Sequence, residues 1–174
     1  ALAGCLMQTV ARNRLATPGI VGLDNGATAF AVASVVGAGI SLAPPAMALT
    51  GAAVAAALTF GLTGRIGVRG YRFLVAGIGV GAVFGALTQL MLTRVSIDAA
   101  NAAYPWTVGS LNARPNHAVL SLSLALPPAL LTGIWLTRSL TVLRLSDAVA
   151  TGLGVATSRC RMIALGISVV LTGL

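Results

Sequence analysis

The sequence contains no lysine and no glutamate, so its eleven basic residues are all arginines and its three acidic residues are all aspartates. Without lysine the chain cannot form a phosphate-binding P-loop, and without glutamate it cannot form a glutamate-based zinc or acid/base site. Its one histidine, His117, lies beside no cysteine or acid that could complete an iron or zinc site. The two cysteines, Cys5 and Cys160, imply no disulfide. We therefore expect no catalytic, cofactor-binding or metal site.

Charged residues are scarce, since they make up 8% of the chain, whereas hydrophobic residues make up 57%. With a mean hydropathy of +0.95, this composition predicts an integral membrane protein in contact with lipid. The net charge of +8 does not indicate nucleic-acid binding, because the arginines separate apolar segments and do not gather on a polar face that carries aromatic residues. They indicate membrane topology instead.

The stretch Phe73–Thr93 is a run of 21 residues without a charged side chain. A helix of that length spans about 31 Å, close to the hydrocarbon thickness of a bilayer. Gly77, Gly81 and Gly85 recur every fourth residue, so they predict a helix face on which another backbone approaches closely. Gln89 continues this row and is expected to face protein or a water-filled path, because an amide is costly against lipid tails. It would either hold the bundle together by an interhelical hydrogen bond or line a pathway.

Other apolar segments predict further crossings, and together they indicate an all-α, polytopic transmembrane helix bundle. Pro18 predicts a turn or broken helix, and Asp24 or Asn25 could cap the helix that follows. Since the chain begins and ends within apolar runs, we expect it to be a fragment. The expected helical segments are the end of one helix at 1–10, spans at about 26–42, 46–62 and 117–136, and the start of another span at 162–174. No acidic residue lies inside these spans.

The arginines predict which side of the membrane each connection occupies. The segment Arg65–Arg72 carries three arginines in eight residues, so the positive-inside rule places it in the cytoplasm. Counting crossings from this segment places nine of the eleven arginines inside and two in the long external connection Arg94–Asn116. Tyr104 and Trp106 in this connection are expected to form an aromatic belt at the external interface.

The cytoplasmic segment 139–161 contains a pattern typical of a short capped helix, from Leu145 to Gly154. Ser146 or Asp147 would supply the N-cap, and Gly152 or Gly154 would end the helix. Such a helix can lie at the membrane surface and offer a face to a partner. The alternative is a re-entrant connector without a partner.

Four segments in order along the chain carry motifs of one family. They are Gly4–Gln8 followed by Arg12–Gly22 (RNRLATPGIVG), Leu74–Gly81 (LVAGIGVG), Trp106–Leu111 (WTVGSL) and Leu145–Val155. Together they resemble the permease subunits of the iron-siderophore and vitamin B12 (FecCD-type) class of ABC importers. The residues that match the signature loop of that family are Gln8, Asn13, Leu15, Ala16, Pro18, Gly19 and Gly22. Arg14 departs from it, since the family usually has proline there.

The resemblance implies a fold of about ten transmembrane helices, of which residues 1–174 would run from the end of the second helix to the start of the seventh. The chain would then be a single permease domain, incomplete at both ends. The family places its fifth helix beside the channel, which makes Gln89, Gly77, Gly81 and Gly85 candidates for the translocation path. The segment 139–161 would carry the coupling helix, with Leu145, Ser146, Asp147, Ala148, Ala150, Leu153 and Gly154 at the ATPase. Ser146 and Asp147 would be the coupling residues, and Ala148, Ala150 and Leu153 the packing face.

The resemblance also implies partners and a function. The chain would be no enzyme, because ATP would be hydrolysed on a separate nucleotide-binding subunit. A second permease subunit, identical or different, and a periplasmic substrate-binding protein would complete the importer. It would move a ferric siderophore or a similar large metal chelate, such as haem or cobalamin, across the bacterial inner membrane.

Two other classes of function compete with this importer. A secondary transporter would show charged or broken-helix ion sites near the membrane midplane, and the absence of acids from the expected spans argues against it. A structural membrane subunit would need neither an ATPase nor the helix at 145–154.

Overall fold

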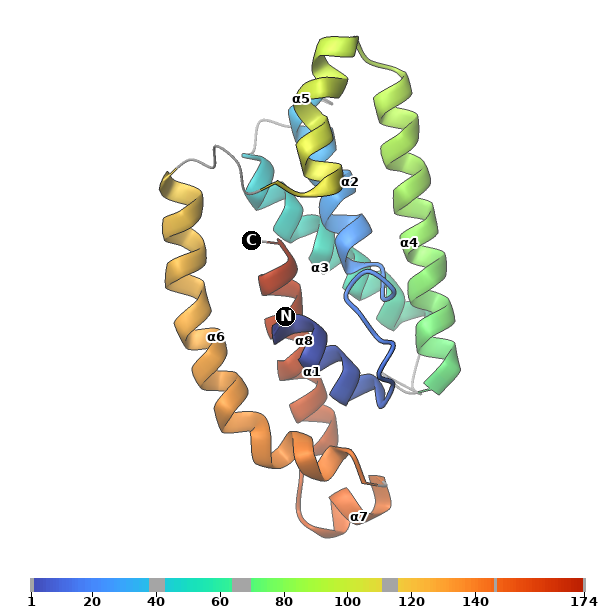
Figure 1. Cartoon of the computed structure of the whole chain (residues 1–174). Coiled ribbons are helices and arrows are strands. Elements are labelled where there is room, and N and C mark those ends of the chain that lie inside the picture. The colour runs from blue at the N-terminus through green and yellow to red at the C-terminus, as the bar shows by residue number, and fades with distance from the viewer. Residues whose placement is uncertain (1, 38–42, 64–69, 111–115, 146, 174) are drawn as a thin grey trace.

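The chain folds into a bundle of α-helices in a computed structural model that describes residues 2–37, 43–63, 70–110, 116–145 and 147–173. Within these residues there are eight helices and no strand, which confirms the all-α prediction (Figure 1). The helices are α1 (Leu2–Ala11), α2 (Leu23–Val35), α3 (Pro44–Thr63), α4 (Gly70–Thr93), α5 (Ile97–Val108), α6 (Asn116–Leu143), α7 (Asp147–Gly152) and α8 (Thr157–Gly173).

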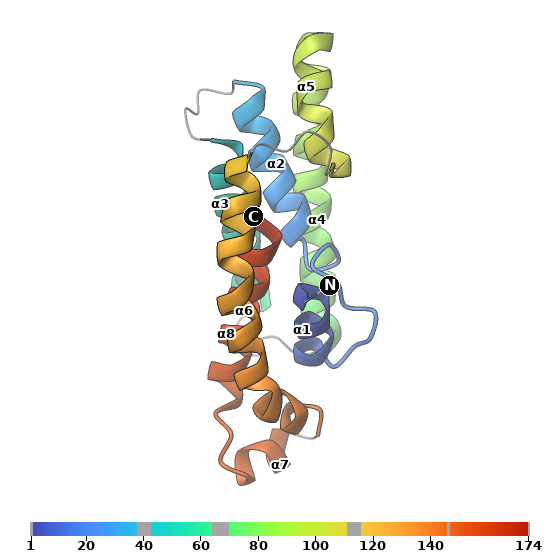
Figure 2. The same cartoon turned by 60° about the vertical axis from the view of Figure 1, so that its left-hand side comes forward.

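Three of these helices are long and apolar enough to cross a membrane: α3, α4 and α6. They coincide with three predicted spans, although α6 continues seven residues beyond the expected end at Leu136. In that extension the hydroxyl groups of Thr137 and Thr141 donate to backbone carbonyls four residues earlier, so polar residues continue the helix past the apolar segment. Figures 1 and 2 show α5 at one end of the bundle and α7 at the opposite end.

The largest buried cluster joins helices that are distant in sequence. Phe73 at the start of α4 is 1% exposed and packs with side chains of α1, the following loop, α6 and α8. The buried members of this cluster are Leu6, Met7, Val10, Val21, Leu23, Phe73, Leu136, Leu140, Leu143, Ala164 and Leu165. The ends of the chain are therefore held together by apolar contact between α1, α6 and α8.

Helices α2 and α3 pack through small residues. A Cβ added to Gly51 would collide with the carbonyl oxygen of Gly26, and a Cβ added to Gly26 would lie 2.6 Å from the carbonyl oxygen of Gly51. Buried alanines continue the contact on both helices. Small residues let two backbones approach closely, which is how helices associate where lipid removes the hydrophobic drive between them.

The glycine row of α4 meets the loop before α2 and the first turn of α2. A Cβ on Gly77 would lie 2.7 Å from the Cα of Val21, and a Cβ on Gly81 would lie 3.3 Å from the Cα of Gly22. The predicted close approach is thus confirmed at two glycines. It is wrong for Gly85, where an added Cβ would meet nothing within 4 Å.

The start of α2 differs from the prediction. The helix begins at Leu23, and its N-cap is Gly22, which has a φ of 84° and makes no side-chain cap hydrogen bond. Asp24 and Asn25 lie in the first turn, so the prediction that either caps the helix was wrong. The amide of Leu23 donates to the carbonyl oxygen of Pro18 at 3.0 Å, so the loop satisfies a free helix-end donor that a side-chain cap would otherwise serve.

The expected external connection Arg94–Asn116 contains a helix that was not predicted, α5. Ser96 is its N-cap, and the hydroxyl of Ser96 accepts from the amide of Ala99 at 3.4 Å. Trp106 on this helix is partly buried and packs against the alanines between α2 and α3, whereas Tyr104 is exposed. Only Tyr104 therefore remains free for the predicted aromatic belt.

The short helix α7 ends as predicted. Gly154 has a φ of 77°, its amide donates to the carbonyl oxygen of Thr151, and the amide of Val155 donates to that of Ala150. This pair of bonds is a Schellman motif, which needs a residue in the left-handed region. The predicted N-cap Ser146 lies outside the described residues. The connector is shorter than the expected 139–161, because α6 ends at Leu143 and α8 begins at Thr157.

We expect Gly77→Ala to destabilise the protein by about 1–3 kcal/mol, since the new methyl group would meet the backbone at Val21. Gly85→Ala is the matched control and should be neutral or stabilising by up to about 1 kcal/mol. Thermal unfolding of the purified protein in detergent measures both. Equal effects of the two substitutions would contradict the close contact between the loop and α4.

Gly154→Ala should loosen the end of α7 by about 1 kcal/mol, because alanine is strained in the left-handed region. Gly152→Ala should instead stabilise α7, since Gly152 is its last helical residue and has open space around it. Hydrogen exchange of the α7 amides should become faster in the first variant and slower in the second. The same change in both would be inconsistent with the Schellman motif.

Candidate functional site

The first half of the predicted signature loop reverses the chain after α1. The backbone amide of Asn13 donates to the carbonyl oxygen of Gln8 at 3.1 Å. The side-chain oxygen of Asn13 accepts from the amide of Leu15 at 2.9 Å, which is an Asx turn. The side chain of Leu15 is exposed and that of Ala16 is buried. These contacts give Gln8 and Asn13 a structural role in the turn.

The second half of the loop carries the chain to α2. The hydroxyl of Thr17 accepts from the amide of Ile20 at 3.2 Å, and the carbonyl oxygen of Gly19 accepts from the amide of Gly22 at 3.0 Å. Gly19 also leaves room for the carboxylate of Asp24, since an added Cβ would lie 3.2 Å from its Oδ2. The matched family residues thus form one compact loop between α1 and α2, whereas their functional role stays a prediction.

This loop places an acidic residue at the depth of the bundle's middle. A Cβ on Gly81, the twelfth of 24 residues in α4, would lie 2.9 Å from the side-chain nitrogen of Asn25. The first turn of α2, which contains Asp24, is therefore level with the centre of a membrane-spanning helix. The three helices long enough to span a membrane carry no acid, as expected, but Asp24 lies level with the middle of one of them. Neither α1 nor α2 is long enough to span by itself, at about 15 and 20 Å, so the crossing is interrupted where Asp24 lies.

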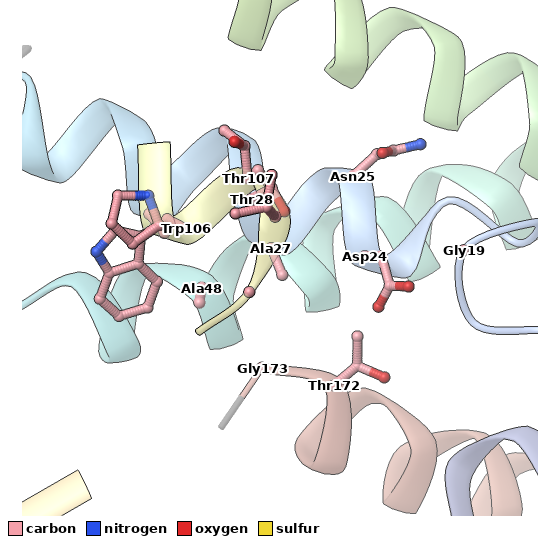
Figure 3. Close-up of a pocket in the computed structure, with 14 residues that line it drawn as sticks. Gly19, Asp24, Asn25, Ala27, Thr28, Ala48, Trp106, Thr107, Thr172 and Gly173 are labelled. Carbon is pink, nitrogen blue, oxygen red and sulfur yellow. The ribbon is translucent and has the colours of Figure 1, made fainter. Parts of the chain in front are cut away.

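Asp24 lines a cavity of about 620 Å³ between α2, α3, α5 and α8. Figure 3 shows its carboxylate close to Thr172 of α8, with Trp106 of α5 toward the other end of the cavity. The residues that line the cavity are Gly19, Asp24, Asn25, Ala27, Thr28, Ala31, Ala48, Pro105, Trp106, Thr107, Val108, Gly109, Thr172 and Gly173. One carboxylate and several hydroxyl groups thus face a space with alanine walls.

Within the described part of the chain, Asp24 has no hydrogen-bond or ion-pair partner. In the same residues, no three of His, Cys, Asp and Glu come close enough to hold a metal ion. Asp24 is exposed in this structure, so its carboxylate is open to the cavity, and an ionisable side chain at membrane depth is a candidate functional group. Sequence reasoning missed this role because it took Asp24 for a helix cap.

The predicted path residues on α4 separate into two pairs. Gly77 and Gly81 are buried under the loop at residues 20–25, so they line no open path in this structure. Gln89 is exposed and Gly85 is partly exposed, and no described residue covers the site of an added Cβ at Gly85. None of the four lines the cavity at Asp24. A place on the translocation path stays a prediction for Gly85 and Gln89.

The second candidate surface is α7. Val149 in α7, and Leu145 and Leu153 just outside its two ends, are 47%, 52% and 62% exposed, and we refer to these three residues as the apolar row. Ala150 is fully buried within the chain, so it does not share a face with Leu153 as expected. The side chains of Asp147 and Ala148 lie outside the described part of the structure. Val149 was missed, although its spacing from Leu145 and Leu153 could have revealed it.

The end of α6, which leads into α7, is hydrogen-bonded to the residue that follows α1. The Nε of Arg12 donates to the carbonyl oxygen of Leu143, the last residue of α6, at 2.6 Å. Arg144 and Arg159 are exposed on either side of α7 in sequence, which gives this end a positive charge. The apolar row therefore lies at a basic end of the bundle, where Figure 2 shows α7.

Known proteins similar to this chain are transport permeases. It is 34% identical to the achromobactin transport system permease protein of Dickeya dadantii, covering 99% of this chain and 50% of that protein. It is 36% identical to a ferric enterobactin transport system permease protein of Escherichia coli, covering 99% of this chain and 52% of the relative. A probable siderophore transport system permease protein of Bacillus subtilis is 32% identical, covering 94% of the chain and 50% of the relative. The chain thus spans about half the length of the curated relatives it matches.

The fold matches a solved structure. An inward-facing transporter of the metal-chelate ABC type superposes with a TM-score of 0.87 at 20% identity, covering 99% of this chain and 56% of that one. This likeness shows a shared helical architecture. The model of the FecCD transport family matches residues 1–174. The chain therefore belongs to the FecCD transport family.

Proposed function

We propose that this chain is part of the transmembrane permease of an ATP-driven (ABC) importer that carries a ferric siderophore or a similar large metal chelate. The observation that carries this proposal is the match to the FecCD transport family over the whole chain. Relatives of about one-third identity are named as permeases of achromobactin and enterobactin systems. With three helices able to span a membrane, the chain would work in the bacterial inner membrane.

The exposed row on α7 supports an ATPase partner. Three large apolar side chains in water at the end of a helical bundle are costly, and an apolar groove on another protein would cover them. Helix α7 packs on α6 and α8, and Arg12 ties the end of α6 to α1. A force on α7 would therefore reach three helices of the bundle. Leu145, Val149 and Leu153 would be the contact residues, with Ser146 and Asp147 beside them.

The absence of lysine indicates that ATP would be hydrolysed on another subunit. A chain without lysine has no P-loop, so a separate nucleotide-binding subunit would hydrolyse ATP and this chain would catalyse no reaction. A second permease subunit would complete the channel, and a periplasmic substrate-binding protein would deliver the chelate to the end that carries α5. The pathway would include Gly85 and Gln89.

Asp24 favours a second candidate, a secondary transporter. An acid at mid-depth beside an interrupted crossing is the arrangement expected of an ion-coupled site. The two candidates differ in one partner, because a secondary transporter needs no ATPase. Association with a nucleotide-binding subunit therefore distinguishes them.

We expect the double variant Val149→Asp/Leu153→Asp to reduce the amount of ATPase subunit that co-purifies by about tenfold or more, relative to the unmodified protein. A neutral polar group buried without a partner in an apolar interface costs about 1–3 kcal/mol and an ionised carboxylate costs more, and this variant adds two carboxylates. Asp147→Arg should also abolish association. The measurement is pull-down of the co-expressed nucleotide-binding subunit from detergent-solubilised membranes.

Ile97→Asp is the matched control, since Ile97 is equally apolar, 80% exposed and on α5 at the opposite end. It should leave the ATPase bound, and all variants should still insert into the membrane. If no form of the protein retains a nucleotide-binding subunit, the importer proposal fails and the secondary transporter takes its place.

A further inference from the structure

The cavity beside Asp24 carries a single charge, and that charge is opposite to the net charge of the protein. Of the described residues that line it, Asp24 alone is charged, although the chain has a net charge of +8. The other two aspartates belong to α5 and α7, at the two ends of the bundle. A negative cavity within a basic protein therefore depends on one side chain.

The polar groups of the cavity gather around this carboxylate. Thr28 lies one helical turn after Asp24 on α2, and Thr172 of α8 lines the same cavity, as Figure 3 shows. Their hydroxyl oxygens can accept hydrogen bonds, as the carboxylate can. This part of the wall thus presents hydrogen-bond acceptors to a guest from two helices.

The rest of the wall is apolar. Ala27 and Ala31 follow Asp24 by about 4.5 and 10.5 Å along the axis of α2, and Trp106 packs against the alanine cluster that contains them. A guest that fills the cavity would therefore place a polar group at Asp24 and an apolar body between the alanines and the indole ring. The length and volume suit a small organic group and not only a bare ion.

We propose that this cavity is a charge-selective binding site that accepts cationic or neutral groups through Asp24 and excludes anionic ones. A charge acts about fourfold more strongly at the effective dielectric of a protein than in water, and a narrow site focuses its field. Among the residues that the structure describes, no basic side chain lines the cavity to offset this repulsion. For the cargo, this inference rests on the proposed function: the imported chelate would be neutral or cationic where it passes Asp24, and a polyanionic chelate would be rejected.

The charge preference can be measured with thiol reagents of opposite charge. Thr28→Cys places a thiol in the cavity, and a cationic methanethiosulfonate should label it at least about tenfold faster than an anionic one of similar size. Asp24→Asn in the same protein should bring this ratio close to that at Cys5, which is exposed on α1 outside the cavity and serves as reference in each molecule. Mass spectrometry resolves the two sites.

Two further variants distinguish an effect of Asp24 on the labelling ratio from a general electrostatic effect and from misfolding. Asp98→Asn removes the same charge from the exposed start of α5 and should leave the ratio unchanged. Thr172→Asp, added to Asp24→Asn, returns a carboxylate to the opposite wall and should restore the preference for the cation. Restored preference also demonstrates that the Asp24→Asn protein is folded.

Equal labelling by both reagents with Asp24 present would overturn the proposal, as would a ratio that Asp24→Asn leaves unchanged. Failure of both reagents to reach the introduced thiol would overturn it too, because the cavity would then be closed to solutes. The experiment needs no ATPase, so its outcome is independent of whether the importer proposal survives the co-purification test.

Discussion

The contact between the loop at residues 12–22 and helix α4 is the constraint on which the rest of the structure depends. Gly22 in the left-handed region and the glycines of α4 let two backbones meet, and no larger residue would fit there. Because this contact lies near the middle of α4, it stops the chain at mid-depth and starts α2 there. The depth of Asp24, the position of its cavity and the packing of α2 on α3 all follow from it.

The prediction from sequence succeeded where the signal is local. The helices α3 and α4 are recognisable as long uncharged runs, since a bilayer requires about 20 apolar residues in one piece. The end of α7 is recognisable because a Schellman motif needs a glycine, and Gly154 stands in the right place. Such features depend on a few neighbouring residues, so a single sequence is sufficient to find them.

The prediction from sequence failed where contacts between distant segments determine the structure. The depth of Asp24 depends on Gly22 meeting α4, and two short helices joined by a loop give no single apolar run that marks a crossing. In α5, Pro105 inside the helix obscured the helical pattern. In α7, six helical residues are too few to define a period, so Ala150 was assigned to the face that Leu153 occupies. The buried and exposed sides become clear only once α6 and α8 are in place.

Arg12 links the two candidate sites physically. It is the only described residue other than glycine with a positive φ, at 51°, and this conformation costs about 1 kcal/mol. The strained backbone ends α1 with the same pair of hydrogen bonds that ends α7, from Arg12 to Thr9 and from Asn13 to Gln8.

A glycine at position 12 would form this turn without strain. It would also lack the guanidinium that bonds the end of α6 beside α7. The hydrogen bond from Arg12 to the end of α6 thus offsets the strain. It connects α6, which leads into α7, to the loop that leads to Asp24. Only eleven residues of chain separate Arg12 from Asp24, and most of them are held by the turns of the loop and by α4. A displacement of α6 at its α7 end would therefore act on the wall of the cavity through a short and well-packed segment.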